Sequence, residues 1–345
     1  MFKKTLIALS ALLALMVPAA ASAASNTGAV VFSKASTVEG VAKGGLFAVK
    51  EGHLNQLTED PTDTEPNFSP DGRTIAFVRG GDIYSVRPDG SGQRQLTSGP
   101  EVDSLPKIAP NGKYVVFERR GALGGPASLY TVGATGGGLR ALTSGDDHDA
   151  AFSPDGKMIV FVRTAAGPEG GNDDVYSIRP TGSGIARLTK TAGVDEFAPR
   201  FFAGGVIYSR GESSAGPAAY ADIYTMRRDG TRPKSQVAGV GSAYVEDVSP
   251  NGKLLIFRRA QGLWAKKIGS GKARKLSTLP DQSTTSSVFS SDGKRVAAFV
   301  QVEDEQQLVS INVETRRTSQ LASGYNFDEG EGTVLGPVID WQPIR

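Results

Sequence analysis

The sequence contains no cysteine and only two histidines and two tryptophans among 345 residues. Without cysteine there is no disulfide and no thiol chemistry, so stability must come from packing. His53 and His148 cannot by themselves supply a three-histidine zinc site. The formal net charge is +2 with both signs spread along the chain, which gives no basic stripe for nucleic acid. We therefore expect no metal, no cofactor and no nucleic-acid partner.

No long hydrophobic run follows the amino terminus. There, Lys3 and Lys4 precede an apolar stretch at 6–17, and Ala21-Ser22-Ala23 offers small residues for cleavage before Ala24. This pattern is typical of a secretory signal peptide, and the apolar stretch is too short to span a bilayer. We expect residues 1–23 to be removed, leaving a single domain at 24–345. That domain would be a monomer without a transmembrane segment, periplasmic or secreted.

An internal repeat dominates the rest of the chain. Each copy has an apolar anchor, a turn of the Ser-Pro-Asp-Gly type, a short strand with an aromatic residue, a second strand often containing Tyr, and a pair such as Leu-Thr. The anchors are Phe68, Ile108, Phe152, Phe201, Val248, Phe289 and Trp341, with successive spacings of 40, 44, 49, 47, 41 and 52 residues. This period is typical of a four-stranded propeller blade.

The two ends of the chain are out of phase with the repeat. The first strand, 29–33, matches the second strand (b) of a blade, and the last, 338–343, matches an innermost strand (a). Joining them would complete a seventh blade and remove open sheet edges. The sequence therefore predicts an all-β, seven-bladed β-propeller of four-stranded antiparallel blades, closed by strands b, c and d from the amino terminus and strand a from the carboxyl terminus. Six blades is the alternative.

The repeat also carries a family resemblance. The segments FSPDG at 68–72, IAFVR at 75–79 and DIYSVRPDG at 82–90 resemble the WD40-like PD40 repeats of TolB-like propellers. The resemblance covers 29–345 and implies an exported binding protein of the cell envelope. TolB proper resembles a six-bladed propeller behind an α/β domain and docks an outer-membrane lipoprotein. This chain departs from that pattern in its predicted seven blades and in lacking the amino-terminal domain, so the lipoprotein-docking role is not carried over.

Two groups of enzymes have similar propellers. Prolyl oligopeptidases and dipeptidyl peptidases add a hydrolase domain that this sequence does not contain, and oligogalacturonate lyases rely on a His-rich metal site. A search of the sequence for a nucleophile elbow or a phosphate-binding loop finds neither. No catalytic residue is predicted, and an enzyme is not the expected interpretation.

Two aligned positions carry charge. Basic residues lie two positions after the strand-b aromatic, and acidic residues lie between strand d of one blade and strand a of the next. The basic residues are Arg79, Arg119, Arg163, Arg210 and Arg259, and the acidic residues are Asp63, Asp103, Asp147 and Glu196, with His148 beside Asp147. Two interpretations stay open. The charges form an ion-pair lattice between blades, or the carboxylates form an acidic arc at the channel mouth that attracts cations or a basic peptide.

Long connections between strands b and c emerge on the same predicted face. Pro217 and Tyr220 lie in the longest of them, and Tyr325 and Phe327 lie in the last connection from strand d to strand a. Loops on a rigid scaffold commonly carry recognition. The favoured hypothesis is an exported, non-enzymatic propeller that binds a protein or peptide partner through this face. The alternative is a carbohydrate-active or lactone-opening enzyme that uses carboxylates at the channel mouth.

Overall fold

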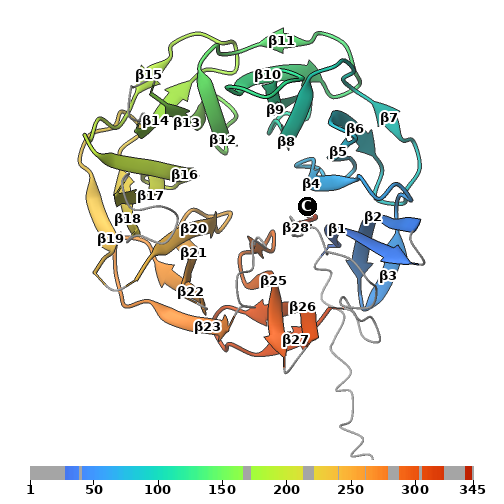
Figure 1. Cartoon of the computed structure of the whole chain (residues 1–345). Helices are drawn as coiled ribbons and strands as arrows, with labels where there is room; N and C mark the ends of the chain where they lie inside the picture. The colour runs from blue at the N-terminus through green and yellow to red at the C-terminus, as the bar shows by residue number, and fades with distance from the viewer. Residues whose placement is uncertain are drawn as a thin grey trace, which may run out of the picture.

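The structure, a computed structural model, describes residues 28–38, 41–165, 172–212, 221–239, 241–260, 262–278, 287–302, 305–321 and 339–343. Seven four-stranded antiparallel sheets are arranged as blades around a central axis (Figure 1). Within the described ranges every regular element is a strand. The predicted seven-bladed all-β propeller is confirmed, and the six-bladed alternative is wrong. The expected signal peptide and its cleavage site lie outside the described residues.

Each blade runs from its innermost strand, a, to its outermost strand, d. Blade 1 contains β28 (Ile339–Trp341), β1 (Val30–Val38), β2 (Val41–Lys50) and β3 (His53–Gln56). Blade 2 contains β4 (Thr64–Phe68), β5 (Ile75–Arg79), β6 (Asp82–Val86) and β7 (Arg94–Gln95). Blade 3 contains β8 (Val102–Ile108), β9 (Tyr114–Arg120), β10 (Ser128–Gly133) and β11 (Arg140–Ala141).

The remaining blades repeat this order. Blade 4 contains β12 (Asp146–Phe152), β13 (Ile159–Thr164), β14 (Asp173–Ile178) and β15 (Ala186–Arg187). Blade 5 contains β16 (Val194–Phe202), β17 (Gly205–Glu212), β18 (Ala221–Met226) and β19 (Lys234–Val237). Blade 6 contains β20 (Ala243–Val248), β21 (Leu254–Arg259), β22 (Gly262–Lys267) and β23 (Arg274–Thr278). Blade 7 contains β24 (Val288–Phe289), β25 (Arg295–Val302), β26 (Glu305–Asn312) and β27 (Thr318–Gln320).

The ring closes through blade 1. Strand β28 pairs antiparallel with β1, with Trp341 opposite Val30. Just beyond this pairing, the Gln342 N–H donates to Ala29 O at 2.7 Å, and the Ala29 N–H donates to Gln342 Oε1 at 3.1 Å. The two ends of the chain are therefore joined by sheet hydrogen bonds, as the out-of-phase repeat predicted.

The hydrophobic core lies between neighbouring blades. Each second strand has neighbours on both sides, and its aromatic side chain is at most 2% exposed in all seven blades. These rings belong to Phe32, Phe77, Phe117, Phe161, Tyr208, Phe257 and Phe299. Within a blade the ring packs against the aromatic of strand c, as Phe161 does on Tyr176 with centroids 5.8 Å apart. Burial on this scale stabilises a domain that has no disulfide.

Polar repeat residues complete the turns. Ser69 Oγ donates to Asp71 Oδ1 at 2.6 Å and accepts from the Thr74 N–H at 2.9 Å, while Gly72 adopts φ of 68°, the left-handed region that glycine tolerates. The threonine of the Leu-Thr pair accepts a hydrogen bond from strand c, as Thr97 Oγ1 does from the Ile83 N–H at 2.8 Å. The repeated sequence therefore satisfies backbone groups at the same places in successive blades.

Candidate functional site

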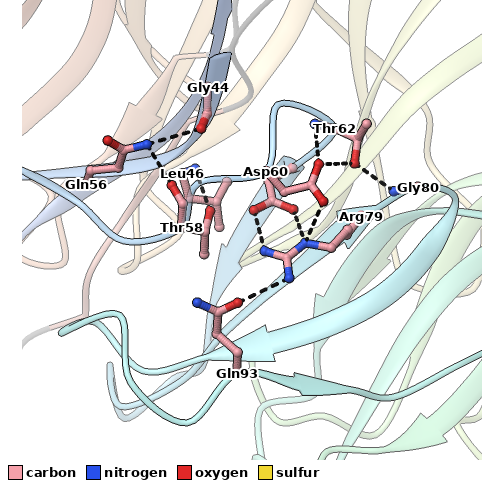
Figure 2. A network of polar contacts seen from close by, with 10 residues as sticks. Gly44, Leu46, Gln56, Thr58, Asp60, Thr62, Arg79, Gly80 and Gln93 are labelled. Atoms are coloured by element: carbon pink, nitrogen blue, oxygen red, sulfur yellow. Dashed lines mark hydrogen bonds and ion pairs between the residues drawn. The ribbon is translucent and has the colours of Figure 1, made fainter. Parts of the chain in front are cut away.

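Three of the predicted acidic residues form ion pairs with predicted basic residues of the same blade. Arg163 lies opposite Asp147 across β12 and β13 and donates to both of its carboxylate oxygens, at 2.6 and 2.8 Å. Asp103 with Arg119 and Asp63 with Arg79 have the same bidentate geometry; Figure 2 shows the surroundings of Arg79. The carboxylate-bearing residues are at most 1% exposed.

The guanidinium group of each pair also lies over the aromatic ring of strand c. The distance from the guanidinium carbon of Arg79 to the Tyr84 ring centroid is 5.1 Å, and Arg119 and Arg163 repeat it within 0.1 Å, at 5.2 and 5.1 Å. Aspartate, guanidinium and tyrosine thus form one stack within a blade. The ion-pair lattice was expected to join neighbouring blades, and this detail of the prediction is wrong. The acid at the start of strand a and the base at the end of strand b are direct cross-strand neighbours, so they pair within their own blade.

In blades 5 and 6 the corresponding acidic and basic positions do not form the bidentate ion pair. Glu196 is buried, and its Oε1 lies 3.7 Å from Arg210 Nε, too far for the bidentate pair. Burial raises the pKa of Glu196 to about 7, which the hydroxyls of Thr189 and Thr191 only partly offset. Arg259 lies 6.0 Å from the Trp264 ring, and Ala243 stands where the acid would be.

His148 lies between two carboxylates on the loop side of blade 4. Its Nδ1 is 3.9 Å from Asp149 Oδ2, and its Nε2 is 3.8 Å from Asp173 Oδ2. Burial alone would lower the pKa of His148, but the two carboxylates outweigh it and raise the pKa to about 10. The ring is therefore an imidazolium at neutral pH and cannot act as a general base there. The other predicted loop residues, Pro217, Tyr220, Tyr325 and Phe327, lie outside the described residues.

A second ring of residues lines the central channel. It consists of the residue immediately before each repeat anchor, on the innermost strands seen around the axis in Figure 1. All seven of these residues line one cavity of about 410 Å³. We call them the channel ring: Asn67, Lys107, Ala151, Arg200, Asp247, Val288 and Asp340. Unlike the ion-pair positions, the channel ring changes chemistry from blade to blade.

The hydrogen-bond acceptors of the channel ring hold neighbouring blades together. Asp340 Oδ2 accepts from the Phe68 N–H of the next blade at 2.7 Å. Asn67 and Asp247 accept in the same way from the anchors that follow them, both at 2.9 Å. Nearby, Glu246 Oε2 accepts from a backbone N–H of blade 7 at 3.0 Å. These acceptors are therefore engaged by the protein itself.

The two cations of the channel ring have no such role. Among the described residues, the Lys107 ammonium makes no hydrogen bond or ion pair, and Arg200 donates only to Pro199 O, at 2.9 Å. Burial lowers the pKa of Lys107, and the charge of Arg200 lowers it further against the opposing effect of nearby carboxylates. Burial raises the pKa of Glu246 to about 7 and that of Asp247 to about 6. Lys107 and Arg200, which have no carboxylate partner within the described ranges, therefore line a cavity in which the pKa values of the carboxyl groups of Glu246 and Asp247 are raised.

The channel ring was not among the residues predicted from the sequence to form a site. The missed signal is chemical variation at a fixed repeat position. The anchors are all apolar, whereas their preceding neighbours include two cations, two acids and an amide. A position that varies in this way cannot serve the same structural purpose in every blade.

The fold defines the class of protein: a seven-bladed β-propeller. The family model for PD40, the TolB β-propeller domain, matches residues 20–170. Over these residues the chain is similar to the PD40 repeats of TolB-like propellers, the resemblance that the sequence motifs indicated. A comparison with curated proteins found no match.

Solved structures share the fold at low sequence identity. An oligogalacturonate lyase in complex with manganese has a TM-score of 0.64 and 13% identity, over 80% of this chain and 86% of that one. TolB from Acinetobacter baumannii has a TM-score of 0.53 and 16% identity, over 92% of this chain and 83% of that one. A puromycin-hydrolyzing peptidase from Mycobacterium tuberculosis has a TM-score of 0.59 and 12% identity, over 84% of this chain and 53% of that one.

These comparisons correct the favoured functional hypothesis. TolB, a lyase and a peptidase share this fold, so the repeat by itself does not indicate a non-enzymatic scaffold. The prediction of a non-enzymatic scaffold for a protein or peptide partner is therefore wrong. No catalytic motif is recognised in the sequence. Over the ranges described, no three His, Cys, Asp or Glu side chains are placed to hold a metal, and His53 is exposed on β3.

Proposed function

We propose that this chain is a carbohydrate-active enzyme that binds an acidic sugar, a uronate-containing oligosaccharide, in its central channel. The observation that carries the proposal is the pair of unpaired cations, Lys107 and Arg200, in one cavity where the hydrogen-bond acceptors already serve the neighbouring blades. A guanidinium group binds a carboxylate in a planar, two-point geometry. Arg200 is therefore assigned the sugar carboxylate, with Lys107 beside it.

Lys107 is suited to remove a proton next to that carboxylate. Its pKa is lowered by burial and by Arg200, so a larger share of the amine is neutral than for an exposed lysine. In β-elimination, Lys107 Nζ would take the proton on the carbon bearing the carboxylate. The electron pair would form a carbon–carbon double bond, and the neighbouring carbon–oxygen bond would break. The departing oxygen would take a proton from water, because both carboxylate oxygens of Glu246 are engaged, Oε1 by Arg258 at 3.5 Å and Oε2 by the Ser287 N–H at 3.0 Å.

The shared fold of the oligogalacturonate lyases supports this choice of substrate class over a neutral sugar. No step is assigned to a metal, because the described donor residues do not fit one. Removal of the proton is therefore assigned to Lys107, a side chain of the channel.

The test is to mix the purified protein with oligogalacturonate and, separately, with a neutral oligosaccharide of equal length. We expect binding of the acidic ligand only, and a rise in ultraviolet absorbance as an unsaturated uronide forms. Lys107→Gln should keep binding but lose turnover, whereas Lys294→Gln, on an exposed turn of blade 7, should match the wild type. Equal binding of both sugars, or no binding of either, would contradict the proposal.

We also propose that the chain is exported and that its amino-terminal segment is removed. The basic residues, apolar stretch and small residues of positions 3–23 support this. Among the described residues, no helix is long and apolar enough to cross a membrane. Expression in a bacterial host should yield a mature chain beginning at Ala24 in the periplasmic or medium fraction. A chain that keeps residues 1–23 and stays in the cytoplasmic fraction would refute export.

A further inference from the structure

One repeat position carries a polar or charged side chain in six blades and a glycine in blade 3. Three residues after the strand-c aromatic, or after Val309 in blade 7, the other blades carry Lys50, Arg87, Arg179, Arg227, Lys267 and Asn312, whereas blade 3 has Gly133. All of these residues lie where strand c leads into its turn to strand d. Blade 3 is therefore the only one without a polar side chain at this position.

The neighbouring blades show what the missing side chain does. In blade 2, Arg87 folds over its own turn, and its Nη1 donates to Ser91 Oγ at 3.2 Å. A Cβ placed on Gly92 would lie 3.0 Å from the same guanidinium nitrogen, so the arginine occupies the space above the turn. In blade 3 the turn continues through Gly136, Gly137 and Gly138, and a Cβ built on Gly137 or Gly138 would meet no atom within 4 Å.

A cavity of about 770 Å³ lies where that arginine is absent, between the turns of blades 3 and 4. Ring and aliphatic surface comes from Tyr114, Val132 and Pro180, and the glycines of the blade 3 turn form a further part of the wall. The volume lies within the range of small-molecule sites, about 300–1,000 Å³. The residues from the turns between strands a and b place this cavity on the face opposite the loops between strands b and c.

The charge in this cavity is of one sign. Arg140, Lys157 and Arg179 line it, and no lining residue is acidic. Arg140 donates to Thr181 O at 3.2 Å and so fixes one side of the cavity. The side chains of Lys157 and Arg179 make no hydrogen bond or ion pair with any residue that the structure describes.

The nearest acid in sequence does not neutralise these cations. Asp155 accepts from Ser153 Oγ at 2.6 Å and pairs with Arg228 at 3.4 Å. It is therefore engaged away from the lining side chains. The site combines an apolar wall with free cations, and that combination selects an anion attached to an apolar body.

We propose that the cavity between blades 3 and 4 binds a small amphipathic anion, a single negatively charged group on an aromatic or aliphatic body. Arg179 and Lys157 would receive the charge, and Tyr114 with the glycine-lined wall would cover the apolar part. This site is separate from the channel, so it stands whether or not the chain acts on an acidic sugar.

The test uses two dyes that differ by one charge. Anilinonaphthalene sulfonate should bind at one saturable site with a rise in fluorescence, and N-phenyl-1-naphthylamine, which lacks the sulfonate, should bind about tenfold more weakly or less. Naphthoate and naphthyl phosphate should displace the sulfonate dye, and their relative strength identifies which anion the site prefers. Displacement by uncharged naphthalene methanol with equal strength would overturn the proposal.

Two variants locate the site. Gly133→Arg restores the repeat side chain and should abolish dye binding while the protein still unfolds in one cooperative transition. Because an added Cβ would lie 3.0 Å from Gly136 O, the milder Arg179→Gln serves as a second test and should weaken binding about tenfold. Lys50→Gln removes the cation at the same repeat position of blade 1 and should change nothing. Wild-type affinity in folded Gly133→Arg and in Arg179→Gln would exclude this site.

Discussion

The two ends of each innermost strand differ in how they use the repeat. At the start, blades 2 to 4 all place an aspartate that pairs with an arginine of the next strand. At the end, the channel ring changes from acid to amide to cation. A residue that keeps the same partner in successive blades holds the blade together. A position where the residue changes is free to serve a ligand, and in the channel ring only Lys107 and Arg200 lack a structural duty.

The strongest way to break this contrast is to remove the repeated pairs. Asp103→Asn combined with Asp147→Asn should lower the free energy of unfolding by about 3 kcal/mol for the Asp103 pair and somewhat less for the other. The reason is that Arg119, only 9% exposed in its side chain, would keep a buried charge without a partner, whereas Arg163 is 24% exposed. Urea unfolding followed by tryptophan fluorescence measures the loss.

A substitution in the turn between strands a and b of blade 2 gives the control. Asp71→Asn should cost less than about 0.5 kcal/mol, because Asn111 and Asn251 already occupy this turn position in other blades, where their Oδ1 accepts from a backbone N–H as Asp71 Oδ1 does. Binding of the acidic sugar should survive in the double variant wherever it stays folded. A double variant as stable as Asp71→Asn would mean that the ion pairs do not hold the blades.

Substitution of a channel cation should weaken ligand binding and leave the free energy of unfolding nearly unchanged. Arg200→Gln should weaken binding of an acidic oligosaccharide about 10- to 100-fold, because a charge-assisted pair is lost. Its effect on unfolding should stay within about 0.5 kcal/mol, since Arg200 has no carboxylate partner among the described residues and its charge opposes that of Lys107. Isothermal titration and urea unfolding of the same sample give both numbers. A large loss of stability with unchanged affinity would make Arg200 a structural residue.

Much of the architecture could be predicted because it depends on local chemistry. The turn residues, the strand-b aromatics and the out-of-phase ends each act within one or two strands, so a single sequence reveals them. Closure through Trp341 followed from the same counting. The ion-pair residues were also found, but their pairing within a blade needed the cross-strand register, which the sequence does not state.

The channel ring was beyond the reach of the sequence for a physical reason. Alternation along a strand fails at a β-bulge, because an extra residue reverses the direction of the side chains that follow. The register of β8 with β9 shifts between Ser104 and Lys107, and Leu105 there adopts φ of 51°. Because the residue is a leucine and not a glycine, the sequence gives no sign of this left-handed conformation. Counting by twos from Asp103 therefore says nothing reliable about where Lys107 points.

The smallest expected effect is in blade 5, where Glu196 and Arg210 stand in place of the bidentate aspartate–arginine pair of blades 2 to 4. Glu196→Asp should let the carboxylate reach Arg210 as in blades 2 to 4, since Glu196 lies directly opposite Arg210 in the same register. The folded-state pKa of Glu196 is raised to about 7, so its contribution to stability is present at low pH and is lost as pH rises from about 4.5 through 7. The aspartate, paired and ionised, should lack this loss. We expect Glu196→Asp to be about 1 kcal/mol more stable than the wild type at pH 8 and no more stable at pH 4. Urea unfolding at the two pH values measures the difference. If the gain were equal at both, ionisation of Glu196 would not be what separates blade 5 from its neighbours.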